Sequence, residues 1–267
     1  MGGGGEIAAS LKAADNYYRH WADTTDRLAM IKARPVAGNL ELGEKFLDSL
    51  QGFIYKKYQD FAAVEEIRLL KRRTDRELRK KERIHSDIKL GLGGIREIEF
   101  FVQSFQLLYG GVIPRIRSGN TPDALDRLLD NGLIDGKDHR FLKESYTFLR
   151  DLEHKLQLVN YLQTQALPEE NSELYFCARR MGYRNEETGA ESGRTMLVAS
   201  FQEDLSRITR GVNRIFSGLL QGEGPNSELS DILLDKSISD DDALQKIRKA
   251  CSPRDPEGIL EGVRILG

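Results

Sequence analysis

Cysteine, proline and long apolar runs are scarce in this chain of 267 residues. Its 2 cysteines are too few for a disulfide framework, which indicates a cytoplasmic protein. No apolar run approaches the length of a membrane span, and the glycine-rich start of the chain has no hydrophobic signal segment, so we expect no membrane partner. A dominant charge is also lacking, because the formal net charge is -2, and we expect no nucleic-acid partner.

The alternating pattern of half-buried strands is missing as well, and helical periodicity dominates. Asn39 and Thr121 are expected helix caps, and Pro122 suits the first turn of the helix that begins there. The pattern predicts helices over residues 8–22, 26–34, 40–58, 61–84, 95–109, 121–130, 137–165, 173–181, 195–220, 241–250 and 256–266. We therefore expect an all-α fold, a bundle of several helices.

A glycine-rich turn is the most informative local feature of the sequence. It directly precedes a predicted helix, and its key members are Lys89, Gly91, Gly93 and Gly94. Glycine permits close approach of the backbone, and the start of a helix offers unpaired N–H groups and a positive dipole. Together with the cation of Lys89, this arrangement suits a phosphate group. The residues alone leave open a tight loop between two packed helices, because the run matches no phosphate-loop fingerprint.

The helix after this turn carries a polar stripe along one face. Its members are Arg96, Glu99, Gln103 and Gln106. We expect the stripe, together with Glu97 in the first turn, to line a nucleotide or substrate cleft. The alternative is a solvated face on which Arg96 pairs with Glu99, while Glu97 only complements the helix dipole.

Two basic residues stand just before Pro35. The side chains of Lys32 and Arg34 have the chemistry to bind the phosphate oxygens of a nucleotide. The alternative is that both residues are ordinary surface charges.

The sequence from Lys89 to Gln103 reads KLGLGGIREIEFFVQ. Further blocks lie in order along the chain at residues 29–38, 105–111, 120–125, 146–154 and 163–168. Together these blocks resemble the glutamine synthetase adenylyltransferase family. The pair Arg96-Glu97 and the later Leu-Glu-His run are closer to the deadenylylating N-terminal half of that family than to its adenylylating half.

The resemblance implies a nucleotidyltransferase-associated helical domain that serves AMP transfer to or removal from a tyrosine of glutamine synthetase, here deadenylylation by phosphorolysis. It implies Mg²⁺ and an adenine nucleotide as cofactors of the parent enzyme, and glutamine synthetase and the PII signal protein as partners. Family members hold metal on a Gly-Ser turn that is followed by an Asp-x-Asp pair. The one Asp-x-Asp pair here, Asp240 and Asp242, is better explained as the start of a helix. We therefore expect that the catalytic α/β core is mostly or wholly absent and that this chain alone is inactive.

We predict three parts: a remnant of the nucleotidyltransferase domain over 1–38, the helical bundle over 39–221, and a linker with short helices over 222–267. The chain is then either an excised fragment or a natural protein that lost the metal-binding carboxylates. Two other functions stay open. One is a non-catalytic docking module for glutamine synthetase or PII, and the other is the helical part of a PII uridylyltransferase.

Overall fold

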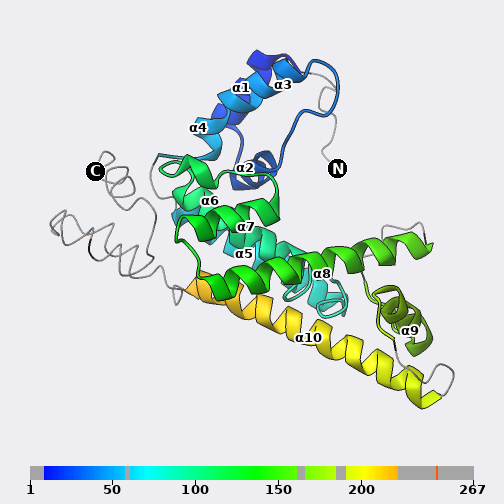
Figure 1. Ribbon diagram of the computed structural model, residues 1–267. Coiled ribbons are helices and arrows are strands. Elements are labelled where there is room, and N and C mark those ends of the chain that lie inside the picture. The colour runs from blue at the N-terminus through cyan, green and yellow to red at the C-terminus, as the bar shows by residue number, and fades with distance from the viewer. Residues whose placement is uncertain (1–8, 58–60, 161–165, 185–190, 222–244, 246–267) are drawn as a thin grey trace.

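The computed structural model describes residues 9–57, 61–160, 166–184, 191–221 and 245, and over these residues it is built of helices (Figure 1). The described elements are α1 (Leu11–His20), α2 (Thr24–Ile31), α3 (Leu40–Ser49), α4 (Gln51–Ile54), α5 (Phe61–Lys80), α6 (Ile95–Tyr109), the 3-10 helix η1 (Pro114–Ile116), α7 (Thr121–Asp130), α8 (Gly136–Asn160), α9 (Asn171–Arg180) and α10 (Glu191–Gln221). The only β-type pairing among these residues is an isolated bridge between Asp87 and Ala166. The prediction of an all-α bundle is confirmed.

Helix α6 lies at the centre of the bundle, and it is buried on nearly every side. Ile95, Ile98, Phe101 and Phe105 are all buried, as are most other residues of this helix. It packs against α5, α7, α8 and α10. Its many apolar side chains favour enclosure by other helices, and its buried polar side chains find partners inside the bundle. The predicted bounds of this helix, 95–109, agree with the structure.

Helices α8 and α10 are the longest described helices, and Figure 1 shows α10 (yellow) running beside α8 (green). We predicted the longest helix over 137–165, but α8 has 25 residues and α10 has 31. Helix α10 begins before Thr195, at Glu191, where an acidic residue in the first turn favours the helix dipole. Residues 161–165 lie outside the described part, as do the predicted helices over 241–250 and 256–266 except for residue 245.

Other helix boundaries also differ from the predictions: α1 is shorter than 8–22, and α2 runs over Thr24–Ile31 instead of 26–34. The helix predicted over 40–58 is interrupted at Leu50, between α3 and α4, and α4 ends at Ile54; Gly52, inside α4, weakens helix propensity there. Helix α5 ends at Lys80 rather than near residue 84, because Glu82 adopts a left-handed φ of 57°. In the part of the chain that is described, no helix is long and apolar enough to cross a lipid bilayer.

The N-terminal helices are anchored to the bundle through α2. The guanidinium of Arg27 donates to the carbonyl oxygen of Ile54 at 3.0 and 2.8 Å, and Gln103 of α6 donates to the carbonyl oxygen of Leu28 at 2.9 Å. These bonds fix α2 against α4 and α6. Helices α1 and α3, in contrast, contain no buried residue.

Candidate functional site

The glycine-rich turn packs closely against α10. Gly91, Gly93 and Gly94 are buried, and Gly93 has a φ of 68°. A Cβ at Gly93 would lie 1.8 Å from the carbonyl oxygen of Thr209. The turn therefore needs glycine both for its backbone conformation and for its contact with α10.

The backbone amides of this turn are occupied within the chain. The amide hydrogens of residues 89–92 and 94–97 are all donated to oxygens of the protein itself. The carboxylate of Asp87 accepts from Lys89 and Leu90 at 3.1 and 2.8 Å, and the carbonyl oxygens of nearby residues accept from the others. The predicted cradle of free amides for phosphate is therefore wrong for this conformation. Contact of the glycines with a nucleotide stays a prediction.

Glu97 forms a buried ion pair with Lys71. Glu97 is 0% exposed, and its Oε1 lies 2.9 Å from Nζ of Lys71 on α5. Asn213 of α10 donates to both carboxylate oxygens at 3.1 Å, and Lys71 also donates to the carbonyl oxygens of Leu90 and Gly91. This cluster joins α5, α6, α10 and the glycine turn beside a cavity of about 170 Å³. A direct contact of Glu97 with substrate stays a prediction.

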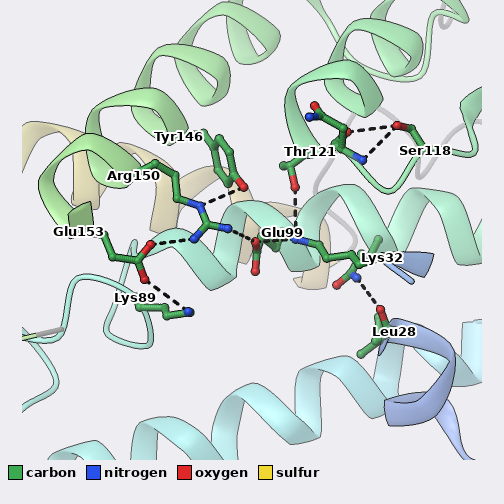
Figure 2. A network of polar contacts seen from close by, with 11 residues as sticks. Leu28, Lys32, Lys89, Glu99, Ser118, Thr121, Tyr146, Arg150 and Glu153 are labelled. Carbon is green, nitrogen blue, oxygen red and sulfur yellow. Dashed lines mark hydrogen bonds and ion pairs between the residues drawn. The ribbon is translucent and has the colours of Figure 1, made fainter. Parts of the chain in front are cut away.

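A second cluster, which we call the charge chain, contains cations and carboxylates in alternation (Figure 2). Its members, in order, are Lys32, Glu99, Arg150, Glu153 and Lys89. Nζ of Lys32 and Nη2 of Arg150 lie 2.5 and 3.2 Å from the same Oε1 of Glu99. Nη1 of Arg150 lies 2.7 Å from Oε2 of Glu153, whose Oε1 lies 3.3 Å from Nζ of Lys89. Three cations, from the C-terminal end of α2, from α8 and from the glycine turn, thus meet at two carboxylates.

The carboxylates of the charge chain are more deeply buried than its cations. The side chains of Glu99 and Glu153 are 12% and 3% exposed, while those of Lys32, Arg150 and Lys89 are 33%, 32% and 27% exposed. The cations are therefore the more exposed partners in each of these ion pairs.

Neighbouring groups stabilise the charged forms of Glu153 and Arg150. Burial alone would raise the pKa of Glu153, yet the hydrogen bond from Arg150 and the charge of Lys89 outweigh it, and the pKa is lowered. Burial would likewise lower the pKa of Arg150, but its hydrogen bonds to Glu153 and Tyr146 raise it. Nε of Arg150 lies 3.1 Å from the hydroxyl of Tyr146, and Lys32 donates to the hydroxyl of Thr121 at 3.4 Å.

The other predicted site residues lie in different surroundings. Gln103 and Gln106 are buried and donate to backbone carbonyl oxygens, so their part of the stripe on α6 lies inside the protein, whereas Arg96 and Glu99 are partly exposed. The guanidinium of Arg96 lies 5.7 Å from the ring centre of Phe100. Arg34 is exposed. The structure brings Lys32, Lys89 and Glu99 together, whereas Glu97 and Gln103 belong to separate contacts.

Our sequence reasoning missed Arg150, Glu153 and Lys71. The signal for the first two was present, because they are three residues apart on one helix face within the block 146–154 that carried the family resemblance. Lys71 gave no such signal, because it is one of many basic residues on α5. Among the described residues, no group of three or more His, Cys, Asp or Glu side chains is arranged to hold a metal ion.

Two family models match this chain in separate regions. The model described as "GlnD PII-uridylyltransferase" matches residues 64–220, more than half of the chain, and the model described as "Glutamate-ammonia ligase adenylyltransferase" matches residues 1–49. The charge chain joins the two regions, since Lys32 lies in the second match and the other four members lie in the first.

Curated relatives agree with these matches. A bifunctional glutamine synthetase adenylyltransferase/adenylyl-removing enzyme of Rhizobium meliloti (strain 1021) is 39% identical over 97% of this chain, and one of Hahella chejuensis (strain KCTC 2396) is 42% identical over 68% of it. The matched regions cover 25% and 19% of these two relatives, so the chain spans about a quarter of their length or less. The matches place this helical bundle among the domains of a family of nucleotidyltransferases. The chain belongs to the family of glutamine synthetase adenylyltransferases.

Proposed function

We propose that this chain is the helical part of an enzyme that removes AMP from a tyrosine of glutamine synthetase by phosphorolysis, and that it orients the catalytic unit against the modified tyrosine. The name of the Rhizobium meliloti relative includes adenylyl removal, and the chain matches a continuous quarter of that protein. The resemblance of the Arg96-Glu97 pair to the deadenylylating half favours this reaction over AMP addition.

The observation that carries this proposal is the ion pair between Lys32 and Glu99. It connects the region that matches the adenylyltransferase model with the bundle that matches the uridylyltransferase model. Two further bonds, from Arg27 to Ile54 and from Gln103 to Leu28, hold the same helix α2 in place. Such fixed contacts suit a bundle whose task is to orient a neighbouring reactive group.

In the proposed reaction, an oxygen of inorganic phosphate attacks the phosphorus of the AMP group. The bond from phosphorus to the tyrosine oxygen breaks, ADP forms, and the tyrosine oxygen takes up a proton. Negative charge spreads over the phosphoryl oxygens in the transition state, and nearby cations stabilise it. Lys32 and Lys89 present such cations. The described residues do not form a carboxylate site that fits Mg²⁺, so we derive no step through a metal on this chain.

A chimeric enzyme tests this proposal. The matched segment of the Rhizobium meliloti relative is replaced by this chain, and ADP release is measured with adenylylated glutamine synthetase, phosphate and Mg²⁺. We expect the chimera to retain adenylyl removal and this chain alone to show little or none. Glu99→Ala in the chimera is expected to lower the rate, whereas Glu77→Ala, which breaks the exposed pair Lys80–Glu77, serves as the control. A chimera that only adds AMP would contradict the proposal.

A second candidate function is docking to glutamine synthetase or to PII, and it is favoured by exposed apolar side chains. Six large apolar residues are exposed on and between α1 and α3: Leu11, Tyr17, Trp21, Val36, Leu40 and Leu42. Exposed apolar groups gathered in one region commonly mark a protein contact. Pull-down with each purified partner tests this function, and Trp21→Ala, which removes a side chain that is 76% exposed, is expected to weaken capture. Release of UMP from modified PII would instead indicate a uridylyltransferase.

A further inference from the structure

We propose that Lys32, Arg150 and Lys89 together bind one phosphate dianion, and that Glu99 and Glu153 are positioning residues for these cations. The inference rests on the proposed function and deepens it, because it adds Arg150 and the two carboxylates to the site and names the ligand. The phosphate belongs either to the free ion or to a nucleotide, and the two share the same tetrahedral chemistry.

The first argument is the surplus of donors on the exposed side of the charge chain. Lys32 donates to Glu99 and Thr121, and Arg150 donates to Glu99, Glu153 and Tyr146. An ammonium and a guanidinium have more N–H groups than these contacts use, so each head group keeps at least one N–H for a ligand. The contact of Lys89 with Glu153 leaves its ammonium with unused donors as well.

The second argument is charge and its direction. Three cations oppose two carboxylates, which leaves one net positive charge on the charge chain. The cations are also more exposed than the carboxylates, so the excess positive charge lies on the more exposed members of the charge chain. A dianion that approaches from solvent therefore meets the positive groups first, and arginine is well suited to hold it through two parallel N–H groups.

The third argument is that the cations are held in place before any ligand arrives. Long lysine and arginine side chains lose considerable conformational freedom when they are fixed. Here Glu99 holds Lys32 and Arg150 through a single oxygen, and Glu153 holds Arg150 and Lys89 through its two oxygens. The folded protein has therefore already lost this conformational entropy. Binding of an anion does not have to fix the three side chains again, which favours its affinity.

The test measures ligand binding to the full chain of 267 residues by calorimetry, without metal and at low salt. The ligands are inorganic phosphate, AMP and adenosine. We expect phosphate and AMP to bind and adenosine not to bind, and raising the salt concentration is expected to weaken both interactions. Equal binding of AMP and adenosine, or no binding of phosphate and AMP by the folded chain, would overturn the inference.

Variants locate the site. We expect Arg150→Ala to weaken phosphate binding at least about tenfold, as for a lost charge-assisted contact, and Lys89→Ala to weaken it several-fold. Arg207→Ala is the matched control, because Arg207 forms an exposed pair with Asp204 on α10 and should leave binding unchanged. Arg150→Lys keeps the charge without the fork of donors and is expected to bind with intermediate affinity. Thermal unfolding establishes that each variant is folded, and binding that is insensitive to both Arg150→Lys and Lys89→Ala would refute the site.

A separate variant tests whether Glu99 positions the cations. Glu99→Gln removes a negative charge beside the proposed anion, so electrostatics alone would strengthen phosphate binding. We expect the affinity to fall instead, because Lys32 and Arg150 lose the charged partner that holds them, and the amide oxygen of Gln is a weaker acceptor. An increase in affinity would contradict positioning by Glu99. If the chimera is active but this chain binds no phosphate, the proposed function holds and the phosphate site is refuted. If this chain binds phosphate but the chimera is inactive, the phosphate site holds and the proposed function is refuted.

Discussion

Lys71 is almost fully enclosed although it carries a charge. It contacts Glu97 and Asp75 and donates to two backbone carbonyl oxygens of the glycine turn. Removing one partner of a buried ion pair leaves the other charge without compensation. We predict that Lys71→Ala lowers the free energy of unfolding by about 3–5 kcal/mol, measured by urea denaturation.

The exposed pair Lys80–Glu77 provides the control on the same helix. Lys80→Ala is expected to leave the urea midpoint unchanged, because exposed ion pairs contribute little to stability. Equal effects of Lys71→Ala and Lys80→Ala would show that the Lys71–Glu97 pair does not stabilise the bundle.

Gly93 presents a different kind of constraint at the scale of one residue. An alanine there would adopt an unfavourable left-handed conformation and would collide with the carbonyl oxygen of Thr209. We predict that Gly93→Ala lowers the free energy of unfolding by about 3 kcal/mol, from backbone strain and overpacking together. Gly218→Ala, inside α10 with open space around its Cβ, is expected to raise it by about 0.5–1 kcal/mol. A stable Gly93→Ala protein would show that the turn can move away from α10.

At the scale of the element, α7 is stabilised at its start by Asn120 rather than by Thr121. The side chain of Asn120 accepts from the amide of Asp123 at 3.0 Å, whereas the hydroxyl of Thr121 accepts from Lys32. Our prediction that Thr121 caps this helix was therefore wrong by one residue. Both residues are common helix caps, and only the contact with α2 distinguishes them.

A cap that lies outside the core should affect stability modestly. We predict that Asn120→Ala lowers the free energy of unfolding by about 1 kcal/mol through the lost bond to Asp123. Asn120→Asp, which keeps an accepting oxygen, should restore most of this loss in the same denaturation measurement. Loss of stability in both variants would indicate that the amide of Asn120 has a separate role.

At the scale of the whole molecule, ion pairs between elements make stability depend on pH. The hydrogen bonds from Lys143 and His139 lower the pKa of Asp126, and the contacts of the charge chain lower that of Glu153. A carboxylate with a lower pKa in the folded state stabilises the fold above its unfolded pKa, and this stabilisation is lost as pH falls through the folded pKa. We predict that the urea midpoint falls as the pH is lowered from about 6 to about 3, below the usual carboxylate range.

Two variants test which carboxylates cause this dependence on pH. In Glu153→Gln, the urea midpoint should fall less steeply as the pH is lowered. Burial and the neighbouring Asp135 raise the pKa of Asp138, which gives it the opposite dependence, so Asp138→Asn should make the loss steeper. The same change of slope in both variants would contradict this assignment.

Much of the fold follows from local patterns. The apolar periodicity of residues 95–109 defines α6, and Asn39 caps α3 as predicted, with its side chain accepting from the amide of Leu42. The surroundings of the polar stripe on α6 could not be predicted from the sequence, because the partners of these side chains come from distant parts of the chain. Glu99 meets Lys32 and Arg150, and Gln103 meets Leu28, at separations that no local spacing encodes.

The sequence by itself determined the helices, the cap of α3 at Asn39 and, to within one residue, the cap of α7. These features depend on residues close together in the chain. It also determined the family, which depends on blocks of sequence in a fixed order. Only the tertiary structure decided that the amides of the glycine turn are occupied and that Lys32, Arg150 and Lys89 share two buried carboxylates. The physical reason is range. Helix formation responds to neighbours within a few residues, whereas an ion pair responds to whichever charge the packing of distant helices brings within reach.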